Sequence, residues 1–198
     1  MKFSGKLTVL LAFISITSTP KTNAQNLDVN ILKGINPRYP DSQVWIQTSN
    51  SAYFVPIGIA ATQMAYGFIA NDKRSRDNSL QTLLSVGIGV VASQAMKSAF
   101  NRTRPQYGKY SSEIFTLSSA NTKSFPSGHA TMAFATATAL TLEYKKWYIA
   151  VPAYAWATGV AYSRMYEGKH YPSDVLAGAV LGVGSAWLSH WLSKKLFR

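Results

Sequence analysis

Residues 163–174 read SRMYEGKHYPSD and place an arginine, a histidine and a carboxylate around the expected start of a helix. Pro172 suits the first helical position, because its fixed φ angle fits a helix and its missing N–H would have no partner there. A helix is therefore predicted to begin near Tyr171, with Asp174 in its first turn. His170 then lies close enough for this carboxylate to hold one ring nitrogen while the other nitrogen attacks a substrate.

Arg164 opens the same stretch and would supply a planar cation for an anionic substrate. A polar loop between two helices could hold the same three residue types without any chemistry. The remainder of the chain must decide between these two interpretations.

Composition restricts the classes of function. The chain has 198 residues, no cysteine, a hydrophobic fraction of 47% and a formal net charge of +12. A single domain is expected from this length. Disulfides, thiolate nucleophiles and cysteine metal sites are excluded, and the few acidic residues and histidines form no ligand cluster in the sequence, so no metal or other cofactor is predicted. The placement of the positive charges favours an anionic membrane over nucleic acid as a partner.

Residues 1–24 are predicted to be a secretory signal peptide. Two lysines precede an apolar run at 7–16, and Thr22, Asn23 and Ala24 offer a small-residue cleavage site. The run is short for a bilayer span, so removal of the leader is expected, with retention as the alternative.

Residues 25–50 are predicted to form an N-terminal periplasmic or interfacial segment. Leu27, Ile31, Leu32 and Ile35 recur at helical spacing. This spacing predicts a short amphipathic helix on the membrane surface, with a helix that packs as a cap on the bundle as the alternative.

Residues 51–198 are predicted to form one all-α domain, a multi-helix transmembrane bundle with about five spans after removal of the leader. The five apolar segments are 52–70, 80–96, 130–142, 148–162 and 175–192. The third is short and rich in threonine, and by length alone it fits a buried helix of a soluble bundle. Glycine and alanine are frequent in the second and fifth segments, which suits close helix approach in a membrane.

Basic residues set the predicted topology. The loops at 71–78 and 143–147 and the tail after residue 192 are short and basic, which places them inside by the positive-inside rule. The connection at 99–125 then lies outside. It has no helical period, and connections of this length are usually functional or disordered.

A second motif follows the second apolar segment. Lys97 and Arg104 are seven residues apart, or about two helical turns, so both would face one side of a helix that persists as far as Pro105. Two cations on one face indicate an anionic ligand. The alternative is a pair of cations that snorkel to the membrane interface.

The third motif, FPSGH at 125–129, opens the third segment. Ser127 is a natural N-cap and Gly128 lets the backbone approach a ligand, so the free N–H groups of this helix start would form an anion cradle. His129 is placed to donate a proton beside it. A capped helix with a surface histidine is the alternative.

All three motifs fall at the same, outer end of the predicted bundle. The three alternatives without a shared ligand would have to coincide there by chance. His190 is the exception among the histidines. It lies near the inner end beside Trp187 and Trp191, and an interfacial histidine without a catalytic role is expected there.

The patterns Lys-x6-Arg-Pro, Pro-Ser-Gly-His and Ser-Arg-x5-His-x3-Asp, in this order, resemble the type 2 phosphatidic acid phosphatase (PAP2) superfamily. This superfamily also includes bacterial class A acid phosphatases and vanadium haloperoxidases. The resemblance runs from about Ala52 to the C-terminus. It implies a helical bundle and metal-independent hydrolysis of phosphomonoesters or pyrophosphates.

Roles for individual residues follow from this resemblance alone. His170 resembles the nucleophile that becomes phosphorylated, Asp174 its orienting partner and His129 the general acid. The residues that resemble phosphate binders are Lys97, Arg104, Ser127, Gly128 and Arg164. Membrane members of the family usually have six spans, so either an uncleaved leader or the 25–50 region would replace the sixth.

The function predicted from the sequence is that of a lipid phosphatase in a bacterial inner membrane, with its active site facing the periplasm. Candidate substrates are undecaprenyl diphosphate, phosphatidic acid, phosphatidylglycerol phosphate and the phosphates of lipid A. The alternatives are a soluble periplasmic non-specific acid phosphatase, a vanadate-dependent haloperoxidase and a non-catalytic protein that binds anionic lipids. The sequence chooses neither the substrate nor the oligomeric state.

Overall fold

A computed structural model describes residues 21–196, with side chains from 27 to 195. The described chain is helical, and its only β feature is an isolated bridge between Thr103 and Lys123. The helices are α2 (Lys21–Ile35), α3 (Gln43–Ile69), α4 (Lys73–Phe100), α5 (Gly128–Tyr144), α6 (Trp147–Tyr166) and α7 (Pro172–Leu196), with 3-10 turns η2 (Pro105–Tyr107) and η3 (Ser111–Glu113). The all-α prediction is confirmed. Most of the predicted signal peptide lies outside the described residues, and its predicted cleavage site after Ala24 falls within α2.

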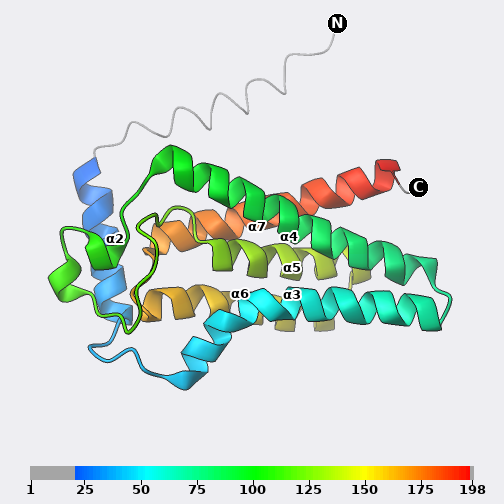
Figure 1. The fold of residues 1–198 in the computed structure, drawn as a ribbon, viewed down its shortest axis with the longest axis horizontal. Helices are drawn as coiled ribbons and strands as arrows, with labels where there is room; N and C mark the ends of the chain where they lie inside the picture. Colours follow the sequence, from blue (N-terminus) through cyan, green and yellow to red (C-terminus); the bar gives the residue numbers. More distant parts are fainter. Residues whose placement is uncertain (1–20, 197–198) are drawn as a thin grey trace, which may run out of the picture.

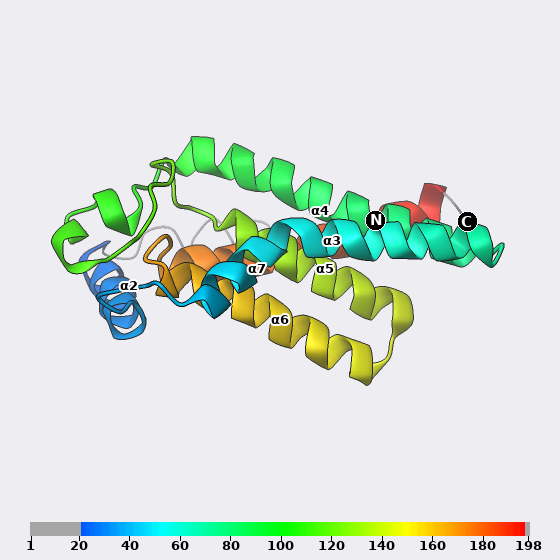
Figure 2. The ribbon, with the colours of Figure 1, turned by 60° about the horizontal axis from the view of Figure 1, so that its bottom comes forward.

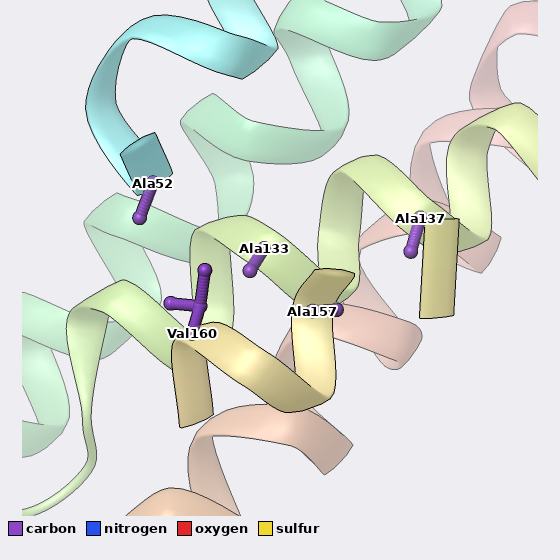
Figure 3. Packing of buried hydrophobic residues seen from close by; sticks show 5 residues of the cluster. All are labelled: Ala52, Ala133, Ala137, Ala157 and Val160. Carbon is purple, nitrogen blue, oxygen red and sulfur yellow. The ribbon is translucent and has the colours of Figure 1, made fainter. Parts of the chain in front are cut away.

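Helix α5 forms the centre of the bundle. It packs against α3, α4, α6 and α7, which run side by side around it (Figures 1 and 2). Its inward side chains are small, and Ala133 and Ala137 meet Ala157 and Val160 of α6 and Ala52 of α3 (Figure 3). Because such side chains take little room, the helix backbones can approach closely.

The contact between α5 and α7 requires glycine. A Cβ atom added at Gly178 would lie 2.5 Å from the carbonyl oxygen of Ser127, and one at Gly182 would lie 2.4 Å from that of Thr131. Both distances are far below van der Waals contact, so the prediction of close helix approach in the fifth apolar segment is confirmed. This packing fixes the start of α5 beside the start of α7.

Three of the described helices are long and apolar enough to cross a membrane, namely α3, α4 and α7. The 28 residues of α4 span about 42 Å, more than the roughly 30 Å of a hydrocarbon core. Large apolar side chains such as Ile57, Phe68, Val91 and Val180 are exposed on the outside of the bundle, as lipid contact requires. The third predicted segment, α5, has only 17 residues and is the buried helix that its length suggested.

The connections divide between the two ends of the bundle. Helix α2, the loop at 101–127 and the connection between α6 and α7 lie at one end, on the left of Figure 1. We call this the site end. The α3–α4 and α5–α6 connections and the C-terminal turn of α7 lie at the opposite, far end (Figures 1 and 2). The basic loops predicted to share one side of the membrane therefore do share one end.

Helix α2 packs as a cap on the bundle. Val29 and Leu32 are buried against Ile114 and Tyr171, while Leu27 remains exposed. The helical prediction for this region is thus confirmed, and its packing matches the alternative of a cap. Helix α3 begins at Gln43, so the boundary predicted at residue 50 lies inside a helix.

Helix α4 does not persist as far as Pro105, which was the condition for Lys97 and Arg104 to share a helix face. The helix ends at Phe100, and Asn101 adopts a left-handed conformation with φ 45° and donates its N–H to the carbonyl oxygen of Lys97. Asparagine accepts this conformation more readily than most residues. Lys97 and Arg104 therefore do not share a helix face, and Arg104 reaches the site from the loop.

Candidate active site

His170 and Asp174 lie at the start of α7, where the sequence placed them. Both are buried, with exposed fractions of 1% and 0%. Asp174 Oδ2 accepts the backbone N–H of Tyr171 at 3.0 Å and faces His170 Nδ1 at 3.5 Å. The other ring nitrogen, Nε2, lies 3.1 Å from Nη1 of Arg104. The Asp174 carboxylate thus faces Nδ1 of His170, and the Arg104 guanidinium lies beside Nε2.

Arg102 is a site residue that the sequence reasoning missed. Its Nη1 donates to Asp174 Oδ1 at 2.7 Å and its Nη2 to Asp28 Oδ2 at 2.8 Å. The guanidinium also lies over the ring of Tyr171, 4.1 Å from its centroid. Burial disfavours the charge of Arg102, but Asp174 and Asp28 outweigh this effect and raise its pKa. A second arginine two positions before Arg104 was the one signal available in the sequence.

Asp28 connects α2 to this group. Its carboxylate accepts the backbone N–H of Ser173 at 2.9 Å and also accepts the Ser173 hydroxyl. Because the backbone N–H groups of the first helical turn have no partner within the helix, Asp28 caps the start of α7 from a distant segment. The cap helix α2 therefore supports the helix that carries Asp174.

Arg104 enters the site from the loop. Its Nη1 donates to the carbonyl oxygen of Lys169 at 2.9 Å and its Nη2 to Asn121 Oδ1 at 3.0 Å. The backbone N–H of Arg104 donates to the carbonyl oxygen of Thr122, and this hydrogen bond joins the beginning and the end of the 101–127 loop. Burial and the neighbouring Arg164 lower the pKa of Arg104 to about 10, so the side chain remains charged at neutral pH.

Arg164 lies in the last turn of α6 and is 5% exposed. Its Nη1 donates to the hydroxyl of Ser49 at 2.6 Å and to Glu167 Oε1 at 3.1 Å. Ser49 comes from α3 and was not predicted, because no local pattern marks a serine 115 positions away as a partner. These contacts hold one side of the guanidinium in place.

Lys97, Ser127 and Gly128 complete the predicted anion-binding set. Lys97 is buried and donates from Nζ to the carbonyl oxygen of Pro126 at 2.7 Å. Ser127 occupies the N-cap position of α5, but its hydroxyl makes no capping hydrogen bond, contrary to the predicted role. A Cβ atom at Gly128 would find ordinary contact with Ser93 at 3.7 Å, so packing does not require this glycine.

Three polar atoms of the predicted anion-binding residues have no hydrogen-bond partner within the described structure. They are Nε of Arg104, Nε of Arg164 and Oγ of Ser127, and all three are buried. A buried donor without a partner costs about 1–3 kcal/mol. The loop, α6 and the start of α5 thus each contribute one donor without an acceptor. A ligand with several acceptor oxygens could accept hydrogen bonds from such donors.

His129 lies in the first turn of α5 and is half-buried. Its ring meets Tyr53 of α3 edge to face, with 4.6 Å between the centroids. Tyr53 is a second residue that the sequence analysis missed. Helix α5 begins at the site end, so His129 lies at the same end of the bundle as the other predicted site residues.

The electrostatics of the site favour a neutral His170. Burial, together with Arg104, Arg164 and Lys97, holds the pKa of His170 well below its ordinary value. A neutral imidazole retains the lone pair that a nucleophile needs. Across residues 21–196, no group of three or more His, Asp or Glu side chains is placed to hold a metal ion.

Curated relatives include lipid phosphatases. The chain is 31% identical over 152 residues to a lipid A 1-phosphatase from Porphyromonas gingivalis, a match that covers 75% of this chain and 31% of the relative. It is 33% identical over 124 residues to an undecaprenyl-diphosphatase from Sulfolobus acidocaldarius, covering 59% and 54% respectively. The chain spans about a third of the length of the first curated relatives it matches.

Two solved structures share the fold. LpxE from Aquifex aeolicus superposes with a TM-score of 0.66 at 25% identity, covering 83% of this chain and 95% of that protein. A transmembrane PAP2-type phosphatidylglycerolphosphate phosphatase from Bacillus subtilis superposes with a TM-score of 0.73 at 24% identity, covering 96% of both chains. Together with its apolar helices, this likeness identifies the bundle as a transmembrane fold. The PAP2 superfamily profile matches residues 78–198, more than half of the sequence, and the chain belongs to this superfamily.

Proposed function

We propose that the protein is a membrane lipid phosphatase that hydrolyses a lipid phosphomonoester or diphosphate. The observation that carries this proposal is the set of buried, unpartnered donors on Arg104, Arg164 and Ser127, together with the 3.1 Å approach of Arg104 Nη1 to Nε2 of His170. Fixed donors of this kind stabilise the charge on a transferring phosphoryl group.

The proposed reaction has two steps. His170 Nε2 attacks phosphorus, so that an N–P bond forms while the P–O bond to the lipid breaks, and His129 protonates the departing oxygen. Water then attacks the phosphohistidine, which breaks the N–P bond and releases phosphate, with His129 taking the proton from the water. The approach of Arg104 to Nε2 favours the tautomer with its proton on Nδ1, facing Asp174.

A lipid substrate is supported by the position of the site and by the relatives. His170 and the anion-binding residues lie at one end of a bundle with three membrane-crossing helices. Relatives are named for lipid A and for undecaprenyl diphosphate. The proposed substrate class therefore comprises lipid A phosphates, undecaprenyl diphosphate, phosphatidic acid and phosphatidylglycerol phosphate.

We place the site end at the periplasmic face of a bacterial inner membrane. The far end supports this orientation, since its two interhelical connections are basic, as cytoplasmic loops are. The residues concerned are Lys73, Arg74, Arg76, Lys145 and Lys146.

A substrate panel tests the proposal. Purified protein in detergent is given the four lipids and a soluble aryl phosphate at equal concentrations, with and without EDTA, and phosphate release is measured. At least one lipid should be hydrolysed with a higher kcat/KM than the aryl phosphate, and EDTA should not reduce the rate. A preference for the soluble phosphate would favour a non-specific acid phosphatase, and lipid binding without phosphate release would favour a non-catalytic binder.

A further inference from the structure

The far end of the bundle holds a second polar cavity, of about 320 Å³, between the first turns of α4 and the last turns of α7. Three cations line it, namely Lys73, Arg74 and Lys194. Among the described lining residues Asp77 supplies the one carboxylate, and its Oδ2 lies 4.0 Å from Lys73 Nζ. Three positive charges against one negative charge make the cavity attractive to an anion.

The wall of this cavity also carries donors without acceptors. Gln81 is 7% exposed, and its Oε1 lies 3.1 Å from Nδ1 of His190. Its Nε2 is buried and has no partner in the described structure, and the same holds for the hydroxyl oxygen of Ser193. Buried polar atoms are nearly always paired in folded proteins, so these two atoms indicate that the cavity is built to receive a polar ligand.

An apolar groove begins on α4 beside this cavity. Its lining residues lie on α4 between Leu80 and Ala92, so the groove begins at the level along the helix where the lining of the cavity ends, at Gln81. Its side chains include Leu83, Leu84 and Val91, which are exposed. Thirteen helical residues cover about 18 Å, and one leaflet of the hydrocarbon core is about 15 Å thick. The groove thus matches the depth of one leaflet.

A cationic cavity at the end of an apolar groove has the shape and charge of a phospholipid site. We propose that this site binds an anionic phospholipid, with its phosphate in the cavity and an acyl chain along α4. Basic pockets between membrane helices attract anionic head groups in this way. Lys73 and Lys97 are 24 residues apart on α4, or about 36 Å, so the site is separate from the active site and faces the other leaflet.

Native mass spectrometry of the full chain released from detergent micelles tests this site. The protein is titrated with phosphatidylglycerol, phosphatidylcholine or inorganic phosphate, and the bound molecules are counted. The test variant is Lys73→Gln/Lys194→Gln. The matched control is Lys145→Gln/Lys146→Gln, which removes two exposed charges from the same end outside the cavity. Hydrolysis of a soluble aryl phosphate confirms that each variant is folded, because none of these lysines belongs to the active site.

The wild type and the control should retain phosphatidylglycerol in preference to phosphatidylcholine. The test variant should bind phosphatidylglycerol about 25-fold more weakly, since each of the two lysines near an anionic lipid contributes about a factor of five. Equal retention of both lipids, equal weakening in the control, or binding of inorganic phosphate as tight as that of the lipid would overturn the proposal.

Discussion

Arg102 donates to Asp174 Oδ1 at 2.7 Å, and this ion pair holds the carboxylate that faces His170. The same guanidinium pairs with Asp28 of α2. The cap helix and the proposed catalytic histidine are therefore connected through Arg102 and Asp174. Asp174 is fully buried, and a buried carboxylate is stable only when it is paired and hydrogen-bonded. The position of His170 therefore depends on residues outside the three motifs.

Replacement of Arg102 by glutamine should lower both stability and rate. The variant leaves Asp174 buried without its cation, which should cost about 3 kcal/mol, the low end of the range for broken buried pairs because Arg102 is partly exposed. Thermal unfolding and aryl phosphate kinetics provide the two readouts. Arg38→Gln, at an exposed arginine, is the control. An Arg102→Gln enzyme with wild-type kcat would show that this ion pair does not position His170.

Asp28→Asn should reduce kcat while leaving KM nearly unchanged. Asp28 contacts Arg102 and Ser173 and none of the proposed phosphate binders, so its loss should disturb the orientation of His170 and leave substrate binding intact. Steady-state kinetics of Asp28→Asn beside Asp41→Asn, an exposed aspartate, separate the two parameters. A rise in KM at constant kcat would place Asp28 in substrate binding instead.

The pH dependence should report the lowered pKa of His170. A nucleophilic histidine loses activity when it is protonated, so a lowered pKa preserves activity as the pH falls through 6.5. Removing a nearby cation in Arg104→Gln should raise the pKa of His170 and move the acid limb of kcat/KM to higher pH. Ionisation of the substrate is the same in the assays of the wild type and of Arg104→Gln, so a difference between their acid limbs comes from the enzyme. Coincident acid limbs near pH 6.5 would contradict this assignment.

His129→Ala should slow hydrolysis most for substrates with poor leaving groups. If His129 protonates the departing oxygen, an alkyl or lipid phosphate should lose about 10²- to 10⁴-fold in rate, and an activated aryl phosphate should lose much less. Rates for a series of leaving groups measure the effect, with Tyr53→Phe as a variant that keeps the aromatic contact of His129. An equal loss for every leaving group would remove His129 from the role of general acid.

Local signals allowed much of this site to be predicted. Pro172 marked the start of α7, the spacing put Asp174 in its first turn with His170 just ahead of it, and the glycines of α7 indicated close helix approach. These features follow from backbone geometry within a few residues.

Other features depend on contacts that no local pattern encodes. Asp28 reaches Ser173 across 145 positions, and Ser49 reaches Arg164 across 115. The end of α4 was left open by the sequence, because the left-handed turn at Asn101 ends the helix although the spacing of the two cations is helical. The packing of α2 as a cap was left open by its sequence because Val29 and Leu32 are buried against Ile114 and Tyr171, which lie far away in the chain.

The central claim is that His170 is the nucleophile, and rapid acid-free quenching with a ³²P-labelled substrate tests it most directly. The wild-type protein should carry an acid-labile, alkali-stable label that maps to His170, and His170→Ala should carry no label and show no turnover. His129→Ala serves as the comparison, because an activated aryl phosphate should still label it. A label of the same kind that persists in His170→Ala, or turnover by that variant at the wild-type rate, would contradict the account.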